Sequence, residues 1–272
     1  MANDYQQTVQ HLSLVGMEAA SPLLASIGKI ATVFPLPPDK NPALPRVVPI
    51  HTIAPETQVG PTANWGTGDS NLTPIIIEPK LYVQAFGIPS DELQLGASLD
   101  WLIALNAQKF AATISDAYTA LLTVDNFGEA IVTKTAGSFG ADDFETTFSA
   151  VPTADRVVVL DSPYFGKVKP ATWLPVGFSN VFEHTRWTAA GTDVRGFAGD
   201  RRAIVISYSE PMTAPIGHQV LARSTMPLPQ IGVCAEASLF YVVATRSIRA
   251  AFALYFGCAV GDPSALKLLK TA

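Results

Sequence analysis

Two short motifs contain residues that could act in nucleophilic or acid–base catalysis. Gly68-Asp69-Ser70 looks like part of a nucleophilic serine motif, but such an elbow needs G-x-S-x-G directly after a strand, and this serine falls in a predicted loop tip. Glu183-His184 could pair a base with its orienting group. Neighbouring residues on an extended segment point to opposite faces, however. We interpret the first motif as a turn and the second as a surface element.

Metal, cofactor and thiol signatures are lacking. The histidines are scattered, without the H-E-x-x-H spacing of a zinc site: His11, His51, His184 and His218. Asp142-Asp143 lacks the alternating oxygen ligands of a calcium loop, and no P-loop or G-x-G-x-x-G occurs. Cys234 and Cys258 each stand alone, so we interpret both as small buried hydrophobic residues. The sequence therefore predicts no catalytic, cofactor-binding or metal-binding residues, and hence no enzyme.

Length and composition indicate a large, weakly charged protein. The chain has 272 residues, which fits one large domain or two small ones. It has 18 Lys and Arg against 23 Asp and Glu, a net charge of −5, and no basic stripe for a sequence-reading nucleic-acid binder. Charged residues make up 15%, whereas soluble domains average about 25%. With a mean hydropathy of +0.26, the chain has few charges to cover a monomer's surface.

A membrane does not explain this deficit of charge. The longest strongly apolar run, Ala250 to Gly261, is shorter than the roughly 18–20 residues of a spanning helix. The start, Met1-Ala2-Asn3-Asp4, lacks the basic region of a secretory signal, and two isolated cysteines favour a reducing compartment. We therefore expect a soluble protein whose apolar surface is covered by other chains in an assembly.

The N-terminal 43 residues predict an arm followed by an extended segment. Residues 1–33 have a weak helical periodicity that Pro22 interrupts. Closely spaced prolines then exclude helix and favour extended backbone: Pro35, Pro37, Pro38, Pro42, Pro45, Pro49, Pro55 and Pro61. Apolar residues between these prolines indicate that the segment lies on a surface.

The pattern of residues 44–88 predicts a long hairpin of two strands. Two strand-like runs, Leu44–Ile53 and Thr73–Gly87, flank a polar tip from about Ala54 to Leu72. The second run alternates, and both of its faces are partly apolar. Because an isolated hairpin is marginal in water, we expect it to lie across a neighbouring subunit; a mobile hairpin loop is the alternative.

The segment from Ser90 to about Val124 predicts a long helix. Ser90 is a suitable N-cap, and Asp91 and Glu92 place negative charge in the first turn. Apolar residues recur at steps of three and four up to a stop at Asp125-Asn126-Phe127-Gly128. A helix of roughly 30 residues would span about 45 Å and act as a structural spine.

The remaining chain predicts a mixed module. We expect a helix over about 142–150, a turn or short helix over 162–169, loops over 171–200 and a short amphipathic tail over 262–269. Strands are expected over 156–161, 203–208, 236–247 and 249–261. Helices and strands in no regular alternation indicate an α+β fold.

Three local strings and the order of the parts resemble a known family. The strings are LYVQAFGIPSDEL (81–93), RVVVLDSPY (156–164) and GFAGDRRAI (196–204). With the arm, hairpin, spine helix and mixed module in this order, the chain resembles the major capsid protein of tailed double-stranded DNA bacteriophages, the Hong Kong ninety-seven-type fold. The resemblance covers about residues 20–265.

The resemblance implies a domain plan. It divides the chain into an N-arm with a Pro-rich extended segment (1–43) and an extended E-loop hairpin (44–88). A peripheral domain with the spine helix takes 89–130 plus roughly 209–250, and an axial domain takes 131–208 plus roughly 251–272.

The resemblance also implies self-assembly into pentamers and hexamers of an icosahedral shell. Candidate subunit contacts on the hairpin are Trp65, Tyr82 and Phe86, because aromatic residues commonly stabilise interfaces; packing within the chain is the alternative, above all for Phe86. Lys80 could cross-link subunits or be a solvated strand residue. The shell would enclose double-stranded DNA without reading its sequence, with scaffolding, portal and decoration proteins as separate possible partners. The implied location is the virion, assembled in the host cytoplasm.

Other functions stay open at this point. An encapsulin-like nanocompartment shell would keep the fold and change the biology. An α+β hydrolase or ligand-binding protein would assemble its site from residues distant in sequence. A phage tail-tube protein is disfavoured by the long central helix.

Overall fold

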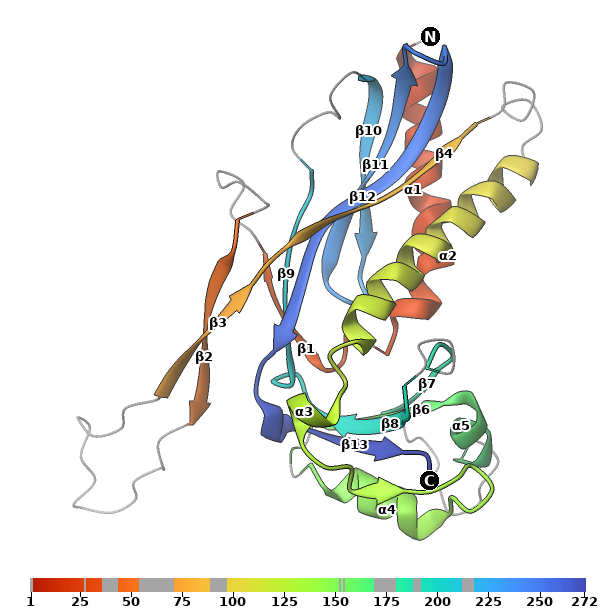
Figure 1. Cartoon of the computed structure of the whole chain (residues 1–272). Helices are drawn as coiled ribbons and strands as arrows, with labels where there is room; N and C mark the ends of the chain where they lie inside the picture. Colours follow the sequence, from red (N-terminus) through yellow and green to blue (C-terminus); the bar gives the residue numbers. More distant parts are fainter. Residues whose placement is uncertain are drawn as a thin grey trace, which may run out of the picture.

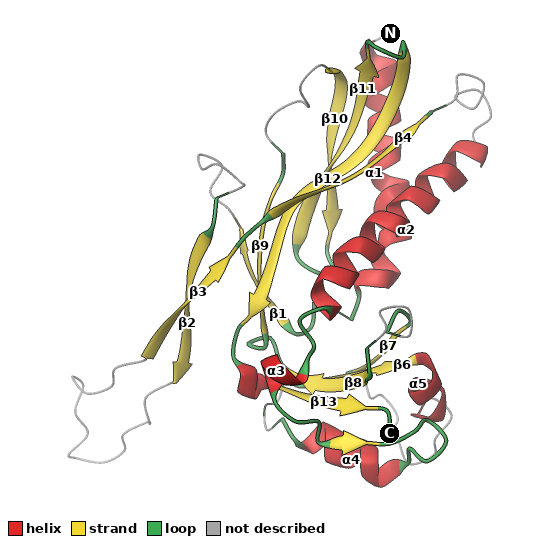
Figure 2. Ribbon diagram, viewed as in Figure 1, coloured by secondary structure: helices red, strands yellow, loops and turns green. Residues whose placement is uncertain are grey.

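The computed structural model is a mixed α+β protein with two sheets and a projecting hairpin (Figures 1 and 2). It describes residues 2–26, 28–35, 44–53, 71–88, 97–151, 153, 155–168, 180–187, 192–211 and 218–272. The helices are α1 (Ala2–Leu24), α2 (Ala97–Thr119), α3 (Val124–Phe127), α4 (Ala141–Ser149), α5 (Ser162–Val168) and the 3₁₀ turn η3 (Pro263–Ala265).

The larger sheet has six strands in the order β1-β9-β12-β11-β10, with β4 also paired to β12. Its strands are β1 (Ala31–Pro35), β4 (Lys80–Gly87), β9 (Ile204–Ser209), β10 (His218–Leu228), β11 (Val233–Val242) and β12 (Ser247–Val260). β1 runs parallel to β9, and the other pairs are antiparallel. β12 is the centre of the sheet, because it pairs with β11, β9 and β4.

Helices α1 and α2 cover one face of this sheet (Figure 1). α1 lies over β10 and β11, and α2 lies over β4 and β12. Phe252 of β12 is fully buried between them, with its ring centroid 6.1 Å from Phe110 of α2 and 5.9 Å from Phe86 of β4. A Cβ at Gly16 of α1 would lie 2.8 Å from the Phe252 ring. The glycine thus lets the helix backbone rest directly on the sheet.

The smaller sheet has five strands in the order β5-β13-β8-β6-β7. Its strands are β5 (Val132–Thr133), β6 (Val157–Asp161), β7 (Val181–His184), β8 (Val194–Gly199) and β13 (Leu266–Lys270). β6 is buried on both faces: Val158 and Leu160 pack in the cluster that contains residues of α4 and α5, while Val157 and Val159 join the core of the larger sheet. The two sheets therefore share a continuous interior.

The hairpin of β2 (Arg46–Ile53) and β3 (Asn71–Ile77) projects from the body (Figure 1). Its strands form a separate two-stranded antiparallel sheet. β3 is followed closely by β4, which belongs to the larger sheet. The expected return strand over 73–87 is thus two strands, and only the first belongs to the hairpin. Of the hairpin's expected tip, 54–72, residues 54–70 lie outside the described residues, and Asn71 and Leu72 begin β3.

Residues 2–24, expected as part of a weakly helical arm, form a helix that packs within its own chain. α1 is continuous to Leu24 with Pro22 in its last turn, so the missing N–H costs one helical hydrogen bond and the helix ends two residues later. Val9, Leu12 and Leu24 are completely or almost completely buried. α2 and the larger sheet supply the partners, and that packing was not visible in the weak periodicity.

Other boundaries also differ from those expected. The spine helix ends at Thr119, well before Val124, and its expected cap Ser90 lies outside the described residues. The expected loop over 171–200 contains β7 and β8, and the tail over 262–269 forms η3 and most of β13. Residues 251–260, expected with the second domain, lie in β12 of the larger sheet.

Candidate functional site

The chemically capable residues are dispersed over the described structure. His11 of α1 has its Nε2 2.6 Å from Oδ1 of Asp100 on α2, in an exposed pair. Glu183 is exposed and His184 is buried at consecutive positions of β7, so they point to opposite faces, and the interpretation of the pair as a surface element is wrong for His184. The described residues hold no group of three or more His, Cys, Asp or Glu side chains that could bind a metal ion.

The other candidate motifs have structural roles or are not described. Asp143 lies in the first turn of α4, where its Oδ2 accepts a hydrogen bond from the Gly140 N–H at 3.1 Å. The Cys258 thiol is part-buried and 3.6 Å from the Ala117 carbonyl oxygen, and burial raises its pKa to about 12, so it is not a nucleophile at neutral pH. Gly68-Asp69-Ser70 lies outside the described residues.

A buried serine–histidine pair lies where the end of α1 meets β7. Ser26 Oγ is 3.2 Å from Nδ1 of His184, both side chains are buried, and the imidazole packs against Trp187 with 4.7 Å between centroids. Burial, and then the nearby Arg186, lowers the pKa of His184 from 6.5 to about 4. Such a histidine is uncharged at neutral pH and shielded from solvent, which fits packing rather than general-base catalysis.

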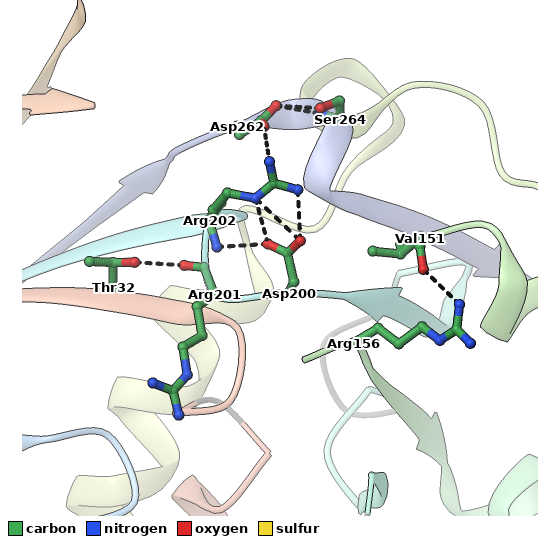
Figure 3. Close-up of polar contacts among 8 residues, drawn as sticks. All are labelled: Thr32, Val151, Arg156, Asp200, Arg201, Arg202, Asp262 and Ser264. Carbon is green, nitrogen blue, oxygen red and sulfur yellow. Dashed lines mark hydrogen bonds and ion pairs between the residues drawn. The ribbon is translucent and has the colours of Figure 1, made fainter. Parts of the chain in front are cut away.

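The two sheets are joined where β8 leads into β9 and β12 leads into β13 (Figure 3). The crossings lie side by side: Gly261 N–H donates to the Ala203 carbonyl at 2.8 Å, and Asp262 N–H donates to the Arg202 carbonyl at 2.8 Å. A Cβ at Gly261 would be 2.3 Å from the Arg202 oxygen. Close approach therefore requires glycine there.

Arg202 holds two acidic side chains at this joint (Figure 3). Its Nη2 donates to Oδ2 of the buried Asp200 at 2.8 Å, and its Nη1 is 3.7 Å from Oδ2 of Asp262. Burial alone would raise the pKa of Asp200, but hydrogen bonds from Arg202 outweigh it and hold that pKa below its usual value. Asp262 also accepts a hydrogen bond from the Ser264 hydroxyl at 2.6 Å. The joint is a bonded connection between the sheets.

The hairpin β2–β3 has one face toward its own chain and one face toward solvent. Val48 and Ile77 are buried and cluster with Val205 of β9. On the opposite face Val47 is paired with Ile76, and these side chains are 66% and 63% exposed. Two adjacent exposed β-branched side chains on a projecting ribbon form a surface suited to another protein chain.

The predicted contact residues of β4 share one face of the strand and differ in how deeply they are buried. Phe86 is 8% exposed and packs against Phe252; Tyr82 is half-buried, with its ring 6.0 Å from that of Phe256. Both rings thus have partners within the chain, whereas Lys80 is exposed at the start of the strand. Trp65 lies outside the described residues.

Further exposed apolar side chains were not singled out in the sequence. Leu81 and Val83 are exposed on the face of β4 that points away from α2, and Trp101 on α2 is 68% exposed with Leu105 one turn later. The alternation of β4 predicted that Leu81 and Val83 share a face. It could not predict which face is outward, because both are partly apolar.

No helix in the described ranges has the length and apolar character needed to cross a membrane. In the sequence comparisons, no protein-family model and no curated protein matches the chain.

Solved structures, in contrast, match nearly the whole chain. The capsid of a native GTA particle matches with a TM-score of 0.55 and 18% identity, over 92% of this chain and 90% of that one. A structure from Mycobacterium phage Adephagia matches with a TM-score of 0.54 and 10% identity, over 91% of this chain and 90% of that one. A virus-like particle from Pyrococcus furiosus matches with a TM-score of 0.54 and 10% identity, over 98% of this chain and 99% of that one. The chain has the fold of these proteins, and this confirms the predicted fold class.

Proposed function

We propose that the chain is a shell-forming subunit: the major capsid protein of a tailed double-stranded DNA phage, which self-assembles into pentamers and hexamers of an icosahedral capsid. The observation that carries the proposal is the shared fold over about nine-tenths of this chain and of the capsid chains. The role is structural, and the low charge content fits a protein that covers its surface with other copies.

In this proposal the hairpin β2–β3 is the main contact between copies. Its exposed pair, Val47 and Ile76, would be buried against a neighbouring subunit. Lys80 and Trp65 belong to the same proposed contact, with Tyr82 contributing the part of its ring that the chain leaves exposed. Phe86 is left out, because its ring is buried against Phe252.

We assign the larger sheet with α1 and α2 to the peripheral domain and the smaller sheet with α4 and α5 to the axial domain. The bonded joint at Arg202 supports a fixed angle between these two parts. A fixed angle matters in a shell, because subunit curvature determines how many copies close a particle. Assembly in a host cytoplasm, enclosure of double-stranded DNA, and contacts with scaffolding, portal or decoration proteins are parts of the proposal that need their own tests.

A nanocompartment shell is the second candidate. It is favoured by the match to the Pyrococcus furiosus particle, which extends over 98% of this chain and 99% of that one. The buried pair of Ser26 and His184 does not support a hydrolase.

Electron microscopy and light scattering of the purified chain test the proposal. We expect closed, uniform particles under at least one assembly condition. A monomer or dimer under every condition would contradict it. Particles that contain a host enzyme when they are purified from cells would select the compartment, and assembly with co-expressed portal protein would select the phage capsid.

A further inference from the structure

The inference concerns β10, the outer strand of the larger sheet. Within the described ranges β10 pairs with β11 alone. Its 11 residues are long for an edge strand, and such edges present backbone groups to which another chain can add. A β-bulge between Val220 and Ala222 protects one end. Pro227, which lacks an N–H, protects the other. Residues 222–226 between them have neither device.

Helix α1 covers this unprotected stretch. Gln6 Nε2 donates to the Arg223 carbonyl at 3.3 Å, and Ser13 Oγ donates to the Thr225 carbonyl at 2.7 Å. The donors are two helical turns apart and therefore share a face. The acceptors are two residues apart on the strand, so their carbonyls point the same way. In an antiparallel pair, alternate residues of β10 point their backbone groups toward β11 and away from it. The carbonyls of Arg223 and Thr225 point away from β11, to the free edge.

The polar donors and the apolar face of α1 are separate features. Val9, Leu12 and Leu24 anchor the helix in the core, and Gly16 brings its backbone within reach of Met226 and Phe252. Ser21, two turns beyond Ser13, continues the polar stripe with a hydrogen bond of 3.1 Å to Gln230 Oε1. Removing the donors should therefore free the strand edge and leave the helix docked.

We propose that α1 closes residues 222–226 of β10 against strand addition by a second copy of this chain. The occupant that it excludes is an extended segment of another copy, the strand-forming partner available at the concentrations where copies associate. Copies would then associate through their faces and hairpins and not by extending the sheet. The coverage of the edge by α1 rests on the fold alone, whereas the choice of a second copy as the excluded partner rests on the proposed self-assembly.

The test removes both donors with Gln6→Ala and Ser13→Ala in the full chain. Amide hydrogen exchange and sedimentation are measured below the concentration at which particles form. We expect exchange of the amides of residues 222, 224 and 226, which face β11, to rise about tenfold because the strand loses its bonds to α1, and we expect the subunit to self-associate. Gln7→Ala with Gln10→Ala, on the exposed side of α1, is the matched control and should change neither. If the double variant does not fold, Ser13→Ala alone should give the same direction with a smaller rise.

A third substitution identifies the edge as the site of association. Thr225→Pro removes an N–H that points away from β11, so it costs no ladder bond and blocks strand addition. Added to the double variant, it should restore the parent's sedimentation. Unchanged exchange, unchanged sedimentation, or association that persists with Thr225→Pro would each overturn the proposal.

Discussion

Helix α1 and the hairpin β2–β3 both carry apolar side chains in the first 88 residues, and no partner for either could be predicted from the neighbouring sequence. In the structure α1 packs these side chains against α2, β10 and β11. The hairpin packs one face against β9 and leaves Val47 and Ile76 exposed. An apolar surplus in a sequence thus has two different outcomes: burial within the chain and surface available to other chains.

This difference changes what the low charge content implies. The N-terminal helix accounts for part of the apolar surplus within the subunit itself. Among the described residues, exposed apolar side chains gather on the hairpin, on the outward face of β4 and on α2 near Trp101. Substitutions can separate these surfaces from the buried contacts of α1.

The largest effect is expected in the core contact of α1. Leu12 is 1% exposed, so Leu12→Ala should lower the free energy of unfolding by about 3 kcal/mol through lost burial and a residual cavity. Leu14 on the same helix is 52% exposed, and Leu14→Ala should change stability by less than about 0.5 kcal/mol. Urea unfolding of both variants measures the difference, and equal effects would refute the assignment of α1 to the core.

Acid should weaken the α1 end of the molecule and spare the hairpin. The pKa of His184 is about 4 in the folded chain and 6.5 when unperturbed, so the unfolded state binds more protons between these values. The stabilisation is complete above pH 6.5 and is lost as the pH falls toward 4, by about 3 kcal/mol in total. Asp200, whose pKa is lowered from 3.8, loses its contribution only below that window.

Urea unfolding between pH 7 and 4.5 measures this loss. His184→Asn should flatten the pH dependence, because it removes the imidazole that takes up the proton on unfolding. Amide protection factors, which correct for the intrinsic effect of pH on exchange, should fall on acidification in residues 20–26 and 181–187 and stay constant in 46–53. A pH slope that His184→Asn does not reduce would be evidence against this origin.

The joint between the sheets should show an intermediate effect. Arg202→Ala leaves the buried Asp200 carboxylate without its guanidinium partner, which should cost about 2 kcal/mol, given that Arg202 is half-exposed and the carboxylate keeps other donors. Arg201 is the matched control, because its side chain points away from Asp200 (Figure 3), so Arg201→Ala should be close to neutral. Thermal unfolding of the two variants makes the comparison, and equal midpoints would contradict the assigned role.

The smallest effect on subunit stability is expected on the hairpin. Val47→Ser with Ile76→Ser changes two exposed side chains, so the free energy of unfolding should shift by less than about 0.5 kcal/mol. The same pair should abolish particle formation in sedimentation experiments. Val48→Ser, on the buried face of the same strand, should instead destabilise the subunit. Intact particles from the double variant would show that this face is not the contact.

Local sequence predicted the elements whose patterns are unambiguous. The β-branched run of Val157, Val158 and Val159 became β6, and the three- and four-residue spacing around Phe110 became α2. β13 was missed because Leu266–Lys270 fits a short helix as well as a strand, and its pairing with β8 and β5 decides between them. β10 was missed because its mixed side chains have no clear period. Non-local pairing decides such segments.

The contact residues were less predictable than the fold. Alternation placed Leu81 and Val83 on one side of β4 and Tyr82 and Phe86 on the other, but only the position of α2 decides which side is inward. Val47 and Ile76 carried no separate signal, because β-branched residues occur on both faces of their strands. Phe86 was predicted as a subunit contact only because it is aromatic, and in the structure its ring is buried in the core of its own chain.

The most direct test of the account is a cryo-electron microscopy reconstruction of the assembled particle at side-chain resolution. We expect α1 to pack against the sheet of its own subunit, and Val47 and Ile76 of each hairpin to be buried against a neighbouring copy. A hairpin that remains in solvent in the particle, or an α1 that packs on another subunit, would contradict it.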